Sequence, residues 1–242
     1  MSRKKPQNRQ RILSFGPGGR RPGAGRPVER RKNKIVLHRS RPEFRKNTPC
    51  HITIRVRRDI ANLRARKRSQ VIRRSLARSC HKPGFRIVDW SILGNHLHLI
   101  VEADGREALG KGMQGFGISM AKSLNALAKR KGPVFIERYH LALLHTPSQV
   151  RRARSYVIAN YRKHCAERRE KLPRGFVDGD HSSWAWFDGW KDLPAYMKKR
   201  AKQERAGPAL AARPQGWLLQ TGWKRRGLMS IHETPGLRRQ RN

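Results

Sequence analysis

Two histidines separated by one residue give this sequence its strongest chemical feature. The stretch Gly-Asn-His-Leu-His-Leu-Ile-Val over residues 94–101 has the composition of a buried strand. Side chains alternate between the two faces of a strand, so His96 and His98 should point the same way. Two imidazoles on one face can chelate a divalent metal, although a pair of polar residues on a half-exposed strand has the same pattern.

A tyrosine and an asparagine lie one helical turn apart later in the chain. Thr146 fits the N-cap of a helix, Pro147 its first position, and Gln149 completes a capping box. On that helix Tyr156 and Asn160 are four residues apart, so their side chains should leave in nearly the same direction. Alone, these residues would be taken as a packing tyrosine and a surface asparagine.

The remaining periodicities predict the elements that would position these residues. We expect α+β, ferredoxin-like split βαβ topology with a four-stranded antiparallel sheet, followed by the helix that carries Tyr156. The expected elements are a strand at 50–57, a helix capped by Asp59 and running to Cys80, a strand at 85–93, a hairpin through Gly94-Asn95 into the histidine strand, a helix with a capping box at Asp104–Glu107 that ends at Gly132-Pro133, and a strand at 134–145. His51 and Thr53 share one face of the first strand, and His51 is expected to be strand surface rather than a ligand.

The charge of the chain restricts its partners. Lys and Arg total 57 against 16 Asp and Glu, a net charge of +41, which suits nucleic acid or an anionic membrane surface. No apolar run approaches the ~18 residues of a membrane span, and the N-terminus lacks the apolar stretch of a secretory signal. Three scattered cysteines make no disulfide framework or zinc site. We expect a cytoplasmic, nucleoid-associated protein with no membrane partner.

Composition divides the chain into three parts. Residues 1–47 form a basic tail expected to be disordered, 48–170 a folded domain that contains the candidate site residues, and 171–242 a basic extension with five of the six tryptophans. Gly25-Arg26-Pro27 in the tail resembles the core of an AT-hook, although a solvated linker has the same composition. The tryptophans should dock on the domain, with base stacking as the alternative.

Together, these features resemble the single-tyrosine HUH transposases, in particular the REP-associated tyrosine transposases and related insertion-sequence enzymes. The resemblance covers roughly residues 48–168 and rests on three segments: Asn95–Val101 matches the metal-binding strand, Tyr156–Asn160 the nucleophile helix, and Gly132–Tyr139 the strand before that helix. The chain departs from the family pattern at Leu93-Gly94, where Met-Pro is common, and at Tyr161, where Pro is common.

The resemblance implies a metal-dependent, single-stranded DNA endonuclease and strand transferase acting at hairpin-associated ends. Tyr156 would be the nucleophile, and His96, His98 and Asn160 would hold Mg²⁺ or Mn²⁺. A tyrosine hydroxyl has a pKa of ~10, so its phosphodiester target needs activation by a metal; the donor chemistry alone would also admit Zn²⁺. We expect Arg26, Arg152 and Lys163 to contact nucleic acid. Family members occur as homodimers and as monomers, and the sequence does not distinguish these states.

Two other functions share these features. A non-enzymatic RNA- or DNA-binding protein could use the same topology as a platform, but it would need aromatic side chains on the open sheet face. A replication-initiator or relaxase-type nickase would share the histidine strand and differ in motif order or tyrosine number. A zinc deaminase is excluded because Cys-x-x-Cys is absent.

Overall fold

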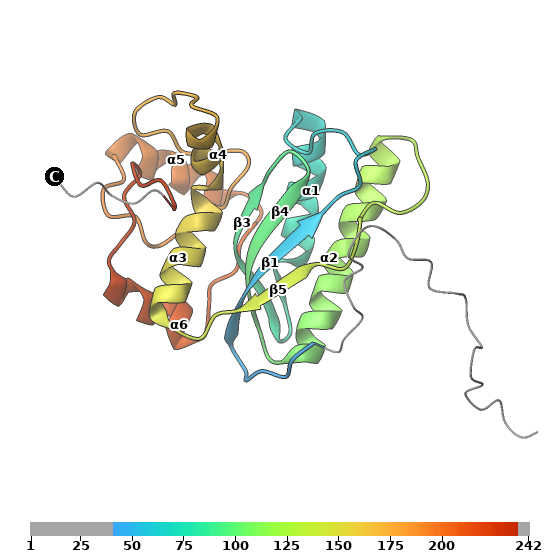
Figure 1. The fold of residues 1–242 in the computed structure, drawn as a ribbon, viewed down its shortest axis with the longest axis horizontal. Helices are drawn as coiled ribbons and strands as arrows, with labels where there is room; N and C mark the ends of the chain where they lie inside the picture. Colours follow the sequence, from blue (N-terminus) through green and yellow to red (C-terminus); the bar gives the residue numbers. More distant parts are fainter. Residues whose placement is uncertain (1–40, 237–242) are drawn as a thin grey trace, which may run out of the picture. The chain divides into compact units, whose positions relative to one another are not determined.

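A computed structural model describes residues 41–236; the tail that contains Arg26 lies outside this range. The described chain has an α+β fold with a five-stranded antiparallel sheet and six α-helices (Figure 1). In chain order the elements are β1 (Thr48–Arg55), α1 (Arg66–Ser79), β2 (His81–Lys82), β3 (Phe85–Ile92), β4 (His96–Ala103), α2 (Arg106–Leu127), β5 (His140–Leu143), α3 (Pro147–Ile158), α4 (Asn160–Glu167), α5 (Ala195–Ala206), α6 (Trp217–Gln220) and the 3₁₀ helix η1 (Gly222–Arg226).

The strand order in the sheet is β2-β3-β4-β1-β5. Four of these strands have the predicted order and antiparallel pairing, including the hairpin between β3 and the histidine strand β4. The fifth strand, β2, was not predicted, because it has only two residues. It pairs with β3 across a tight turn at Pro83-Gly84, where a φ of 67° at Gly84 favours glycine.

Helices α1 and α2 cover one face of the sheet (Figure 1). Alternate residues of β4, Leu97, Leu99 and Val101, point into this layer and are fully buried. They pack in one cluster with the apolar stripes of the two helices, which include Ile72 and Phe116. This face therefore follows the ordinary alternation of a strand with one apolar side.

Helix α3 and the C-terminal extension cover the opposite face (Figure 1). An apolar cluster joins Ile100 of β4 and Val157 of α3 to Trp223 of the extension. Trp223 is 0% exposed and belongs to this cluster, which confirms for this residue that an extension tryptophan docks on the domain. Trp184 is 1% exposed but packs in a cluster of extension residues, and Trp217 is 49% exposed.

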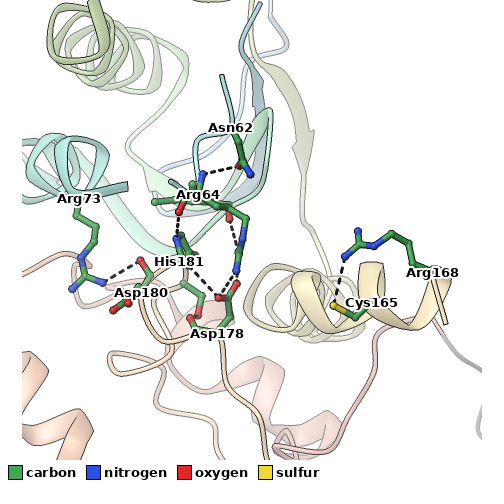
Figure 2. Close-up of polar contacts among 10 residues, drawn as sticks. Asn62, Arg64, Arg73, Cys165, Arg168, Asp178, Asp180 and His181 are labelled. Carbon is green, nitrogen blue, oxygen red and sulfur yellow. Dashed lines mark hydrogen bonds and ion pairs between the residues drawn. The ribbon is translucent and has the colours of Figure 1, made fainter. Parts of the chain in front are cut away.

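The extension also protects an open edge of the sheet. Beyond the short β2, the backbone of His181 and Ser183 exchanges hydrogen bonds with Trp90 and Ile92 of β3. Figure 2 shows the contacts that anchor this segment: Arg64 forms two hydrogen bonds with Asp178, of 2.7 and 2.9 Å, and its carbonyl accepts one from His181 of 2.9 Å. An edge that would otherwise present unpaired backbone groups is thereby covered.

Several predicted boundaries are wrong. Helix α1 begins at Arg66 rather than at Asp59, which instead pairs with Arg57 and Arg130. Helix α2 begins after Gly105 without a side-chain cap, because Asp104 is engaged by Arg86, and it ends at Leu127. The strand predicted at 134–145 is reduced to β5, with one isolated bridge at Phe135. None of the helices described for residues 41–236 is long and apolar enough to cross a membrane.

Candidate active site

The pairing of β1 with β4 sets the positions of the histidines. In this register Thr53 lies opposite His98 and Arg55 opposite His96, while His51 lies opposite Ile100. Because side chains alternate, His96 and His98 point away from the apolar layer that holds Leu97 and Leu99. They lie on the face covered by α3, as the alternation predicts.

Helix α3 brings Tyr156 onto this pair. Its N-terminus is the predicted capping box, in which the Thr146 hydroxyl accepts from the Gln149 backbone N–H. Val150 and Val157 on the same helix are fully buried against the sheet. The Tyr156 ring then packs edge-on against the His98 ring, with the centroids 5.1 Å apart.

The histidine rings form a compact group. The centroids of His96 and His98 are 4.9 Å apart, and those of His51 and His98 are 5.1 Å apart. His51 also lies 5.8 Å from the Tyr156 ring. Three imidazoles and one phenol thus meet on one side of β1 and β4.

Hydrogen bonds occupy one nitrogen of each β4 histidine. Nδ1 of His98 lies 3.0 Å from Thr53 Oγ1 and 3.2 Å from His51 Nε2. Nδ1 of His96 donates to Asn95 Oδ1 at 2.7 Å, which leaves Nε2 of His96 with its lone pair. Nε2 of His98 is buried and has no hydrogen-bond partner among the described residues. Such an orphaned buried nitrogen is expected where a ligand binds.

Burial keeps these imidazoles neutral. It is the largest cause of the lowered pKa of His98, to about 2, to which the charged forms of His51 and His96 would add repulsion. Burial likewise lowers the pKa of His51 to about 4, and that of His96, with a contribution from Arg55, to about 4. At neutral pH each ring therefore keeps a lone pair on one nitrogen, as metal ligation requires.

Asn160 does not extend α3, contrary to the prediction of one continuous helix. The chain leaves helical geometry at Ala159, where φ is −105° and ψ is 20°, and Asn160 begins α4. Its side chain is 0% exposed, and neither its oxygen nor its nitrogen has a hydrogen-bond partner among the described residues. One turn later on α4, the His164 ring lies 6.4 Å from that of His96.

These residues supply some, but not all, of the ligands that a divalent cation needs. The neutral nitrogens of His96 and His98 and a buried, unpartnered amide oxygen on Asn160 are suitable donors. Within residues 41–236, no group of three His, Cys, Asp or Glu side chains could hold a metal ion. A metal here would therefore need the Asn160 oxygen, water or substrate to complete its ligands.

The predicted nucleic-acid contacts have different surroundings. Lys163 Nζ lies 5.1 Å from the centre of the Tyr156 ring and 3.2 Å from Glu167. Arg152 is exposed and lines a pocket of about 850 Å³ with Tyr156, His51 and the segment 230–236. Arg26 lies outside the described residues.

Sequence reasoning missed His51, Thr53 and His164 as members of this group. The sequence shows that residue 51 is a histidine and which face of β1 it occupies. It does not show that β1 pairs with β4 in the register that brings His51 to His98. For His164, the sequence signal was a position four residues after Asn160, which places both on one side of a helix.

Comparisons with known proteins give distant likenesses. No family model matches the chain, and no curated protein matches it. A structure of a REP-associated tyrosine transposase bound to a REP hairpin aligns at 18% identity with a TM-score of 0.43, covering 53% of this chain and 74% of that one. A candidate transposase from Deinococcus radiodurans R1 aligns at 10% identity with a TM-score of 0.36, covering 53% and 95%. The chain is thus similar to these two structures over about half its length.

Proposed function

We propose that this chain is a divalent-metal-dependent endonuclease and strand transferase for single-stranded DNA, with Tyr156 as its nucleophile. One observation carries the proposal: the Tyr156 ring lies 5.1 Å from the ring of His98, whose buried Nε2 has no partner among the described residues. A tyrosine ring in contact with a histidine that has an unpartnered nitrogen brings together the two residue types that metal-assisted phosphoryl transfer requires.

In this reaction the Tyr156 oxygen attacks the phosphorus of a phosphodiester. The new bond joins phosphorus to the tyrosine oxygen, the bond to the 3′-oxygen breaks, the phenol gives up its proton and the leaving 3′-oxygen gains one. The products are a 5′-phosphotyrosine and a free 3′-OH. Because the phosphodiester energy is conserved in the covalent link, a second 3′-OH can reverse the step on another strand without ATP.

The residues around Tyr156 would supply binding and orientation. When bound, Mg²⁺ or Mn²⁺ would polarise the phosphodiester and neutralise developing charge. His96, His98 and Asn160 would hold it, and Lys163, 5.1 Å from the Tyr156 ring, would add positive charge beside the phosphate. The basic composition, together with Arg152 and Arg26, would hold the DNA backbone. The hairpin-associated target follows from the motif resemblance alone.

The burial of the sheet argues against a passive binding platform. All eight residues of β3 are buried, and α3 and the extension pack over the face on which bases would have to stack. RNA recognition on an open sheet needs exposed aromatic side chains there. The covered face favours chemistry at a confined site over stacking.

The deciding experiment compares Tyr156→Phe with Tyr161→Phe. Tyr161 lies five residues later and is half-buried, so both changes remove one hydroxyl and keep the ring. With 3′-labelled single-stranded hairpin DNA and Mn²⁺, the wild type and Tyr161→Phe should give a slow-migrating covalent adduct on a denaturing gel. Tyr156→Phe should give none, at unchanged thermal stability. An adduct that persists in Tyr156→Phe would assign the nucleophile elsewhere.

The metal requirement is tested on the same gel. We expect His96→Ala or His98→Ala, or addition of a chelator, to remove the adduct, and Asn160→Ala to weaken it. Adding a second strand with a free 3′-OH should then convert wild-type adduct into a joined product. Adduct formation that is indifferent to chelator would exclude the metal role, and cleavage without adduct would indicate a hydrolytic nuclease.

A further inference from the structure

His98 differs from His96 in the number of groups around its inner nitrogen. His96 Nδ1 meets one acceptor, Asn95 Oδ1. His98 Nδ1 meets two groups from the neighbouring strand, Thr53 Oγ1 at 3.0 Å and His51 Nε2 at 3.2 Å. Both come from β1, Thr53 directly opposite His98 and His51 two residues away on the same face.

Each of these neighbours can donate or accept, so the contacts alone leave the tautomer of His98 open. The other nitrogen, Nε2, has no partner among the described residues in either tautomer, and a buried polar atom left unsatisfied costs ~1–3 kcal/mol whether it is a donor or an acceptor. A divalent cation can satisfy a lone pair on Nε2 but not a proton there. A cation site therefore selects the tautomer with its proton on Nδ1, where there are two candidate acceptors within 3.2 Å.

We propose that Thr53 and His51 are positioning residues that hold the proton of His98 on Nδ1 and so present the Nε2 lone pair to a divalent cation. The inference rests on the proposed function for the identity of that cation. Neither residue needs to touch it. Ligating histidines commonly donate their second N–H to such a partner, and loss of the partner weakens metal binding ~10–100-fold.

Matched substitutions separate the acceptor from the shape of the side chain. Thr53→Val removes the hydroxyl at nearly constant volume, while Thr53→Ser keeps it. His51→Leu removes the acceptor near Nδ1, while His51→Gln keeps a polar group there. Because either group could serve alone, the double variant Thr53→Val/His51→Leu is the decisive one, and Thr53→Ser/His51→Gln is its control.

The readout is Mn²⁺ binding without DNA, followed by the electron paramagnetic resonance signal of free Mn²⁺ during titration. We expect the dissociation constant to rise ~10–100-fold in Thr53→Val/His51→Leu and to stay within a few-fold of wild type in Thr53→Ser/His51→Gln. Unchanged affinity in the first double variant would overturn the inference. Loss of binding by His98→Ala confirms that the titration reports this site.

A second measurement needs no substitution. The ¹⁵N chemical shifts of His98 in the metal-free wild-type chain distinguish the two tautomers, and we expect the proton on Nδ1. A proton on Nε2 would overturn the inference even if the double variant fails to fold. If the wild type binds no Mn²⁺ while His98 has the expected tautomer, the metal role in the proposed function fails and the positioning of the proton stands.

Discussion

On one face of the sheet, Ile72, Leu97 and Phe116 pack in a cluster of apolar side chains. On the other, the ionisable side chains of Asp89 and Arg154 are equally buried, at 0% and 1% exposed. Burial raises the pKa of Asp89, and the neighbouring Arg154 opposes that shift. Arg154 donates to both carboxylate oxygens of Asp89, at 2.7 and 3.2 Å, and to Asp188 at 3.0 Å. The face covered by α1 and α2, the apolar face, needs only side chains of the right volume. The face covered by α3 and the extension, the polar face, also needs a specific hydrogen-bond or ion-pair partner for each buried polar group.

The polar face obtains many of these partners from the extension. Glu102, which is 0% exposed, accepts from Arg86 on β3 and from the backbone N–H groups of Gln215 and Gly216, both at 2.6 Å. Asp188 and the rings of Phe187 and Trp223 surround Arg154. The face that carries the candidate site is therefore completed by residues far from it in sequence, and its stability should depend on them.

The largest expected change in unfolding free energy comes from breaking the buried ion pair between Arg154 and Asp89. Arg154→Met leaves Asp89 buried without its partner and should cost ~3–5 kcal/mol of unfolding free energy in urea. Adding Asp89→Leu removes the stranded charge and should recover much of that loss. On the apolar face, Leu97→Ala should cost ~2–5 kcal/mol through a cavity. A double variant no more stable than Arg154→Met would show that the pair is not coupled.

Acid should lower the unfolding free energy through His98, which lies on the face covered by α3. The pKa of His98 in the folded chain is lowered to about 2, so the unfolded chain, with a histidine pKa of ~6.5, binds the proton instead. The contribution of His98 to the unfolding free energy is therefore fully present above pH ~6.5. It falls as the pH drops toward 4, by at most ~1.4 kcal/mol per pH unit.

The contribution of His98 can be measured from the slope of unfolding free energy against pH. His98→Gln should reduce the dependence of unfolding free energy on pH between 6.5 and 4. Equal slopes in wild type and His98→Gln would show that His98 titrates normally in the folded chain.

Two glycines differ in the space around them, one packed in the extension and one exposed on α2. A Cβ on Gly189 would lie 1.9 Å from Trp223 Cη2 and 2.7 Å from Phe187 Cζ, so Gly189→Ala should cost ~1–3 kcal/mol by overpacking the extension. A Cβ on Gly115 of α2 meets nothing within 4 Å. Gly115→Ala should therefore stabilise by ~0.4–1 kcal/mol, and thermal melts of the two variants should shift in opposite directions.

A comparably small effect is expected at the start of α3. Thr146→Ala removes the hydroxyl that accepts from Gln149 N–H at 3.2 Å and should cost ~1 kcal/mol. Thr146→Ser keeps the cap and should cost less. A matched loss in both variants, measured by urea unfolding, would mean that packing of the Thr146 methyl group matters more than the capping hydrogen bond.

Elements with a strong local pattern could be predicted from the sequence. Alternation of β-branched residues located β1, the Gly94-Asn95 turn located the hairpin between β3 and β4, and the capping box located the start of α3. The start of α1 could not be found this way, because Asp59 is a good cap locally but forms ion pairs with Arg57 and Arg130 instead. Tertiary contacts overrode propensity there.

The candidate site was predictable to the same degree. His96, His98 and Tyr156 have local signals, and the structure brings their rings together. The break at Ala159 and the approach of His51 to His98 depend on strand register and on packing of α4, which no window of sequence contains. Their assignment as functional residues stays a prediction until the variants are measured.

The hydrogen bonds of Glu102 also bear on how the chain is made. Its backbone partners Gln215 and Gly216 come 113 and 114 residues later. At ~5–20 residues per second of synthesis, they leave the ribosome roughly 6–23 s after Glu102. During that interval Arg86 can already pair with the carboxylate, but water must take the place of the two backbone N–H groups. The carboxylate of Glu102 therefore reaches its full set of partners only seconds after its own synthesis.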